Sequence, residues 1–206
     1  MDPEHTICRL LKGSRYNPVQ ERISMPVLPI VRLGHPSLRT PAQPLPPALL
    51  ARPEIQGLID SMVETMRDAR GVGLAAPQVG EELQIFVYQA AGPPEIPLRV
   101  VVNPLVTPQA REVAYDWEGC LSIPDLRGLV PRHPRVRVQG LDREGHPLDY
   151  VVMGFEARIV QHEYDHLNGV VFLDRMRDFK TLAYFDEWEQ YLGGRSPQDL
   201  DDTAVG

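Results

Sequence analysis

The chain has 206 residues, of which 43% are hydrophobic and 24% are charged, and its formal net charge is −7. This length predicts one domain that buries a core without disulfides or a structural metal, and the ordinary composition argues against wholesale disorder and coiled coil. No run is rich in Lys and Arg, which argues against nucleic acid as a partner, because binding to the phosphate backbone of nucleic acid requires clustered positive charge.

The N-terminal segment shows no hydrophobic periodicity. Residues 1–24 mix glycine, proline and scattered charges, so we expect an extension outside the core, dispensable or absent from the native protein, with Met25 as an alternative start. The apolar residues 26–31 indicate the start of an edge strand. The prolines between positions 41 and 47 then predict a surface loop.

A helix and several strands are predicted in the middle of the chain. Residues 54–69 carry apolar side chains at helical spacing, and the pattern stops at Gly71. Short apolar runs predict strands, of which the last two form a hairpin: 84–88, 100–102, 136–140 and 148–152.

Two further helices are expected toward the C-terminus. One runs from about 155 to 167 and ends at Asn168-Gly169, and the other covers about 179–192 before a polar tail at 193–206. Helices and strands do not alternate regularly, so the order of elements predicts an α+β fold with mostly antiparallel strand pairing. The core domain would span residues 25–192.

The predicted helix at 155–167 contains the run His162-Glu163-Tyr164-Asp165-His166. Side chains four positions apart on a helix differ by about 40° in azimuth and about 6 Å in rise, so both imidazoles can converge on one metal ion. Glu163 then lies beside the ion, where its carboxylate can act as a general acid/base. Phe155 and Ile159 continue the stripe of the two histidines, which indicates that they point inward, although two hydrogen-bonded core histidines would be the alternative.

A metal site with an open position needs a third protein ligand. We favour Cys120, which follows Gly119 in a segment where glycine permits a close backbone approach. A lone cysteine can equally be a small buried hydrophobe, or could pair with Cys8, the other cysteine of the chain. A downstream carboxylate is the rival third ligand, and the candidates are Asp174, Glu187 and Glu189.

The glycine-rich run at 71–76 matches the dinucleotide-binding pattern G-x-G-x-x-A. It follows a helix rather than a strand, and Pro77 disfavours helix at Ala76, so a nucleotide site is not expected. A run of glycines and small residues allows a peptide to approach the backbone closely, and Gln78 at its end supplies an amide donor. A tight turn after the helix is the alternative.

Together, the three segments at 71–78, 118–122 and 161–166 resemble the three motifs of peptide deformylases, in that family's order and approximate spacing. The resemblance covers roughly residues 25–175. It implies a compact single-domain α+β enzyme, in which antiparallel sheets pack around a central metal-binding helix. It also implies removal of the formyl group from the formyl-methionine that begins new polypeptides.

The resemblance also assigns roles to residues. Cys120, His162 and His166 match the family's metal ligands, and Glu163 matches its acid/base. Gln78 and the backbone N–H of Leu121 match the donors that hold the oxyanion. The family usually works with one Fe(II) ion, which zinc, nickel or cobalt can replace, and a Cys-His-His site suits several of these metals.

For substrate binding, we expect Val72, Phe155 and Ile159 to form an apolar slot for the methionine side chain, with core packing as the alternative. The substrate backbone would lie extended along Gly73 and a strand edge. Asp116-Trp117 precede Glu118 where many relatives carry an apolar residue, which affects the rim of this slot.

Two other functions compete with this one. The first is a metallopeptidase with the H-E-x-x-H motif and a carboxylate ligand, and the second is a non-catalytic peptide-binding module stabilised by metal. No stretch reaches the roughly 18 apolar residues of a membrane span, and the first residues do not form a signal sequence. We therefore expect a cytoplasmic monomer that acts on nascent polypeptides, without direct contact to nucleic acid, since the acidic C-terminal helix lacks a basic face for ribosomal RNA.

Overall fold

The computed structural model describes residues 26–193. The predicted extension at 1–24, Cys8 and residues 194–206 of the predicted tail lie outside the described residues. The described elements include seven helical segments, namely η1 (Pro36–Leu38), α2 (Pro47–Leu50), α3 (Pro53–Asp68), η2 (Ala76–Val79), α4 (Gly154–Leu167), η3 (Phe172–Arg175) and α5 (Phe185–Tyr191).

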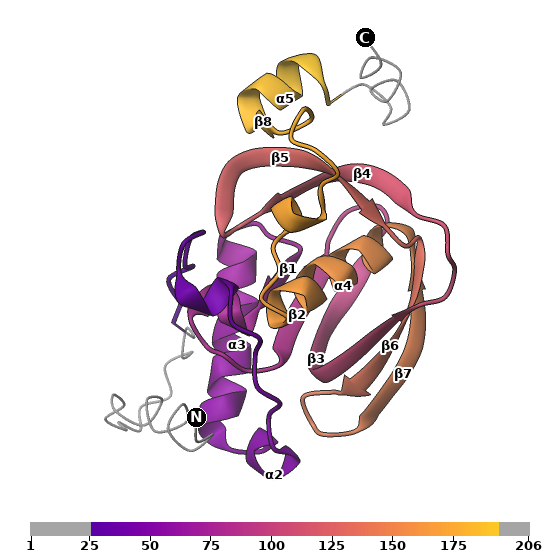
Figure 1. The fold of residues 1–206 in the computed structure, drawn as a ribbon. Helices are drawn as coiled ribbons and strands as arrows, with labels where there is room; N and C mark the ends of the chain where they lie inside the picture. The colour runs from indigo at the N-terminus through magenta and orange to yellow at the C-terminus, as the bar shows by residue number, and fades with distance from the viewer. Residues whose placement is uncertain (1–25, 194–206) are drawn as a thin grey trace.

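Two antiparallel sheets frame helix α4 (Figure 1). The first has five strands in the order β1 (Gly73–Ala75), β2 (Ile85–Ala90), β3 (Ile96–Pro108), β6 (Arg135–Leu141) and β7 (Pro147–Met153). The second has three strands in the order β4 (Ala114–Cys120), β5 (Ile123–Arg132) and β8 (Ala183–Tyr184). Together they confirm the predicted α+β fold with antiparallel pairing.

The core is divided among three hydrophobic clusters. One joins the apolar face of α3 to β1 and β2, with Ile59, Met62 and Leu74 fully buried. A second packs α4 on the five-stranded sheet, and a third lies between the β4–β5 hairpin and η3. Helix α4 is therefore covered on several sides, which is why polar side chains on it are buried.

Glycines set both ends of α4. Gly154 starts the helix with φ +58°, and Gly169 follows its end with φ +70°, a left-handed conformation that most residues avoid. At Gly169 an added Cβ would also lie 2.8 Å from the backbone of Arg39. The stop predicted at Asn168-Gly169 is thus confirmed, and it allows the chain to turn back beneath η1.

Several predictions about elements were wrong. Residues 26–31 form no strand, because isolated hydrogen bonds such as Val31 N–H to the Gln78 carbonyl replace a ladder. The last helix, α5, is shorter than predicted, since residues 183 and 184 pair with β5 instead. Cys120 lies at the end of strand β4, which was not predicted, and part of the glycine-rich run forms β1, an edge strand, rather than only a tight turn.

Among the described residues, no helix combines the length and the apolar character needed to cross a membrane.

Candidate active site

Helix α4 and strand β4 bring the three predicted metal ligands together. The ligand atoms of Cys120, His162 and His166 all lie within 4.8 Å of one another. The Cys120 Sγ is 3.3 Å from the His166 Nε2, and all three side chains are buried. A thiol and two imidazoles one helical turn apart therefore form a compact group with the donor types that zinc and iron prefer.

Glu118 orients one of these histidines. The Nδ1 of His162 donates a hydrogen bond of 2.9 Å to the Glu118 Oε2, which leaves Nε2 as the atom available to a metal. Glu118 and Cys120 are two residues apart on β4, and although the pairing with β5 is irregular between them, both side chains contact His162. One strand end thus supplies a ligand and the group that holds another ligand in place.

Two buried arginines keep Glu118 ionised. Arg132 donates to both carboxylate oxygens at 2.8 and 3.0 Å, and Arg158 donates to Oε1 at 2.8 Å. Burial alone would raise the pKa of Glu118, but hydrogen bonds from Arg132 and His162 hold it well below its usual range. Arg132 also pairs with Asp165 on α4, so the network links the second sheet to the metal-binding helix.

The site favours a cation. Burial alone would lower the pKa of His162, but its contacts with Cys120 and Glu118 raise that pKa well above the ordinary value. Glu118 and the Cys120 thiol, which stabilise a proton on His162, would also stabilise a divalent metal ion. Burial and the neighbouring His162 lower the pKa of His166 well below its ordinary value, which favours the neutral imidazole that binds metal. The donor set, the burial and the fixed orientation of His162 all fit one bound metal ion.

Glu163 lies beside the ligands and is itself buried. Burial raises its pKa to about 7, and its Oε2 has no hydrogen-bond partner within residues 26–193. Gly73 of β1 covers this carboxylate, since a Cβ added there would lie 2.3 Å from the Oε1. A carboxyl group that titrates near neutral pH suits both uptake and release of a proton.

Gln78 presents its amide nitrogen to the ligand group. Its Oε1 accepts a hydrogen bond of 2.8 Å from the Ala75 N–H, which fixes the orientation of the amide. Its Nε2 then lies 3.5 Å from the Cys120 Sγ and 3.4 Å from the Ser122 Oγ. The amide N–H groups therefore point toward the place where a metal and a substrate oxygen would meet.

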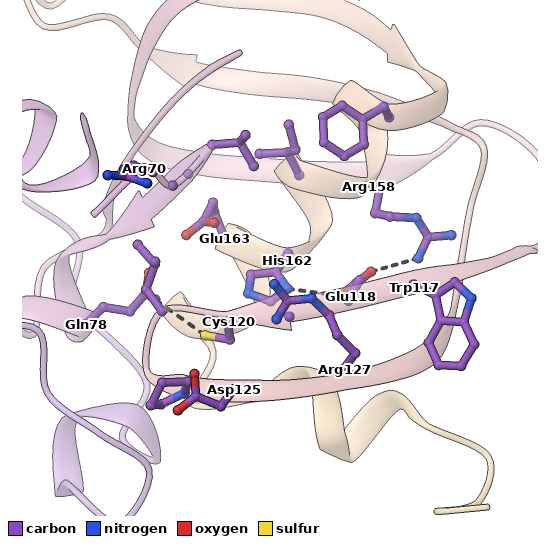
Figure 2. A pocket seen from close by; sticks show the side chains of 18 residues that line it. Arg70, Gln78, Trp117, Glu118, Cys120, Asp125, Arg127, Arg158, His162 and Glu163 are labelled. Atoms are coloured by element: carbon purple, nitrogen blue, oxygen red, sulfur yellow. Dashed lines mark hydrogen bonds and ion pairs between the residues drawn. The ribbon is translucent and has the colours of Figure 1, made fainter. Parts of the chain in front are cut away.

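A pocket of about 510 Å³ opens over these groups (Figure 2). His166 is fully buried and does not line the pocket. All other predicted site residues do line it, namely Val72, Gly73, Gln78, Cys120, Leu121, Phe155, Ile159, His162 and Glu163. The predicted apolar slot has polar neighbours, because Arg158 and Glu118 also face the pocket. The pocket is therefore only partly apolar.

The rival carboxylate ligands lie elsewhere. Asp174 pairs with Arg39 and accepts from the Val171 N–H, and it lines a separate pocket. Glu187 and Glu189 are exposed on α5 and do not line the active-site pocket. The structure contradicts these three candidates, because none of them reaches the group formed by Cys120 and the two histidines.

Other pocket residues were not predicted from the sequence, namely Arg70, Pro124, Asp125, Arg127 and Arg158. Their only common signal is position, since all five lie within about five residues of a motif. Trp117 was noted only as a departure at the rim, and it does line the pocket. Figure 2 shows Arg127 extending from β5 toward the middle of the pocket.

Comparison with known proteins gives the family. The polypeptide deformylase profile matches residues 27–181. Peptide deformylase 1 of Nitrosomonas europaea is 42% identical over 166 residues, which are 78% of this chain and 93% of that protein. Peptide deformylase 2 of Pseudomonas putida is 44% identical over 161 residues, which are 75% and 90% of the two chains.

Solved structures agree with the sequence relatives. The class I type b peptide deformylase from Acinetobacter baumannii, with Met-Ala-Ser bound, superposes with a TM-score of 0.71 at 39% identity. The match covers 74% of this chain and 99% of that one. The fold and the pocket are thus those of a metal-dependent hydrolase, and the chain belongs to the polypeptide deformylase family.

Proposed function

We propose that this enzyme removes the N-formyl group from the formyl-methionine at the start of newly made polypeptides. The observation that carries the proposal is the arrangement of Glu163 and Gln78 around the group of Cys120, His162 and His166 in one pocket. Membership of the deformylase family supports the same activity.

The residues of this chain would divide the chemistry among them. When bound by Cys120, His162 and His166, a divalent metal ion polarises a carbonyl oxygen and lowers the pKa of water. Glu163 accepts a proton from the attacking water and then delivers it to the leaving amine, as its pKa near 7 allows. The Gln78 amide and the Leu121 N–H donate to the oxygen that becomes negative, and they need little reorganisation to do so.

The substrate would lie across the mouth of the pocket. Val72, Phe155 and Ile159 would contact the methionine side chain, and all three line the pocket. Gly73 belongs to β1, which is the edge strand of the five-stranded sheet, so an extended peptide could pair beside it. The Acinetobacter relative holds Met-Ala-Ser, a peptide that begins with methionine.

The metal and the cellular setting are further parts of the proposal. Fe(II) would be the native ion, with zinc, nickel or cobalt able to replace it, because a thiolate with two imidazoles accepts each of them. The protein would act as a cytoplasmic monomer without direct nucleic-acid contact, consistent with its net charge of −7. Residues 25–192 would form the catalytic domain, flanked by the extension 1–24 and the tail 193–206.

Substitution of Glu163 tests the activity. The variant Glu163→Gln should keep its metal and lose turnover of a formyl-Met tripeptide by several orders of magnitude, measured anaerobically with metal analysis of the same sample. The variant Glu189→Gln, which changes an exposed carboxylate outside the pocket, should turn over normally. Unchanged hydrolysis in Glu163→Gln would remove this residue from the mechanism.

Metal content tests the two competing functions. Cys120→Ser should lose metal, whereas Asp174→Ala and Glu187→Ala should retain it. The opposite result would favour a peptidase with a carboxylate ligand. A wild-type protein that binds metal and formyl-Met peptides without hydrolysing them would favour the non-catalytic binding module.

A further inference from the structure

The segment after residue 181 lies beyond the part of the chain that matches the family profile. It forms the two-residue strand β8, which is the third strand of the three-stranded sheet, and the helix α5, which packs against β5 (Figure 1). Strand β8 pairs with the stretch of β5 that lines the active-site pocket, with Ala183 opposite Arg127. This C-terminal segment therefore lies directly behind the rim of the site.

Aromatic side chains of α5 contact two residues of that rim. The Phe185 ring lies under the Arg127 guanidinium, whose Cζ is 4.8 Å from the ring centroid. Trp188 meets Trp117 edge-on, with ring centroids 5.9 Å apart, and also stacks on Phe185. Because Arg127 and Trp117 both line the pocket, α5 touches the site through two of its rim side chains.

The position of Arg127 is closely defined. Its Nη1 donates a hydrogen bond of 2.9 Å to the Leu126 carbonyl. The same nitrogen lies against the backbone of Gly119, where an added Cβ would come within 1.9 Å of it. Phe185 supports the guanidinium from the α5 side, so a flexible side chain is held next to the end of β4, which carries Cys120.

Outside the buried Glu163 and the paired Glu118 and Arg158, the pocket is lined by two arginines and one carboxylate. Arg70, Arg127 and Asp125 line it, and Arg158 is already paired with Glu118. Arg70 forms no ion pair within residues 26–193, and Arg127 faces Asp125 alone as a nearby opposite charge. The whole chain has a net charge of −7, so this mouth is a local exception.

We propose that β8–α5 is a specificity element of this active site, in which Phe185 positions the Arg127 guanidinium to bind an acidic side chain in one of the two residues after the substrate's N-terminal methionine. This inference rests on the proposed function. Arg127 would touch the substrate, whereas Phe185 acts through Arg127 and is a positioning residue.

Matched peptides isolate the charge. Formyl-Met-Asp-Ala amide and formyl-Met-Asn-Ala amide differ only in charge, as do formyl-Met-Ala-Asp amide and formyl-Met-Ala-Asn amide. The wild-type metal-loaded enzyme should show a KM two- to fivefold lower for the Asp member of at least one pair, with similar kcat. At 1.4 kcal/mol for each tenfold change in affinity, a two- to fivefold ratio corresponds to about 0.4 to 1 kcal/mol of binding free energy, which is the range of a partly exposed ion pair. It should shrink in 1 M salt.

Variants then separate the guanidinium from its support. Arg127→Gln should bring the ratio of KM for the Asn peptide to KM for the Asp peptide to one. Phe185→Leu should lower this ratio toward one without changing kcat or metal content. Phe185→Tyr keeps the ring and should keep the ratio. Phe185→Leu combined with Arg127→Gln should equal Arg127→Gln alone. Tyr191→Leu, at an exposed residue of the same helix, is the control and should behave as wild type.

Each part of the proposal can fail separately. Absence of hydrolysis of any formyl-Met peptide by the wild type would reject the proposed function. Normal hydrolysis with a ratio of one in both pairs would reject the acidic preference and leave the function intact. A ratio that disappears in Arg127→Gln but persists in Phe185→Leu would reject the role of α5.

Discussion

A single methyl group on Gly73 should displace the acid/base of this enzyme. In the native structure a Cβ at this position would lie 2.3 Å from the Glu163 Oε1 and 2.7 Å from its Cδ, whereas ordinary contacts begin near 3.4 Å. The difference between 3.4 and 2.3 Å means that Gly73→Ala pushes the carboxylate away by about 1 Å. Gly73 lies in strand β1, so alanine meets no backbone penalty and the fold should persist.

A displacement of about 1 Å at a reacting group can cost about 100-fold in rate. We therefore expect kcat of Gly73→Ala for a formyl-Met tripeptide to fall by about two orders of magnitude. Metal content should be unchanged, because Glu163 is not a ligand. The measurements are steady-state kinetics under anaerobic conditions, metal analysis and thermal unfolding of the same samples.

Gly92→Ala is the matched control, since a Cβ at Gly92 would meet nothing within 4 Å. It should leave kcat, metal content and stability unchanged. A wild-type kcat in Gly73→Ala would mean that the Glu163 carboxylate need not occupy its observed position during the reaction. Loss of metal together with activity would mean instead that the methyl group disturbs His162 and the ligand group.

Three further predictions concern the buried charges, the surface and the metal. Glu118→Gln leaves Arg158 without its anion and Arg132 with Asp165 as its only anion. Unfolding should therefore cost about 3 to 5 kcal/mol less, and metal affinity should fall about 10- to 100-fold, measured by urea unfolding and chelator competition. Equal affinity would contradict the role given to Glu118. Burial alone would raise the pKa of Asp174, but Arg39 and the Val171 N–H lower it, so the ionised group stabilises the fold above its unfolded pKa of about 3.9. Asp174→Asn should therefore destabilise by at most about 1 kcal/mol at pH 7, since both partners are more than a third exposed, and the difference should shrink as the pH falls from 5 to 3; a constant difference would refute this. Removal of metal with a chelator should lower the unfolding temperature of the wild type, metal addition should restore it, and Cys120→Ser should show neither response.

Local patterns in the sequence predicted the parts of the site that depend on one element. His162 and His166 share a face of α4 because their spacing is close to one helical turn, and this geometry holds wherever the helix packs. The C-terminal end of α4 followed from Asn168 and Gly169 for the same local reason. The antiparallel hairpin of β6 and β7 was predicted from its turn and alternating strands, and the register from Arg135 to Leu141 bears this out.

Contacts between distant segments could not be derived in this way. Strand β5 contains two prolines and a glycine, and β4 is a short strand in which charged residues alternate with aromatic ones before Gly119, so neither strand carries an apolar run and neither was predicted. The edge-strand prediction for 26–31 failed because an apolar run is compatible with packing by side chains alone, as Leu28 and Ile30 do against the first core cluster. Strand formation there depends on a neighbouring edge that the sequence does not specify.

The buried network around Glu118 is the clearest case of this limit. The inward stripe of α4 was predicted to hold Phe155, Ile159 and the two histidines. Arg158 and Asp165 are buried on this helix as well, because β4 and β5 supply Glu118 and Arg132 as partners. Each of these charges would be costly to bury alone and becomes tolerable only once the others are in place. The network therefore forms only when the second sheet closes over α4, and the orientation of His162 depends on that closure. The ligand spacing is thus a property of the helix, whereas the readiness of the site to bind metal is a property of the whole fold.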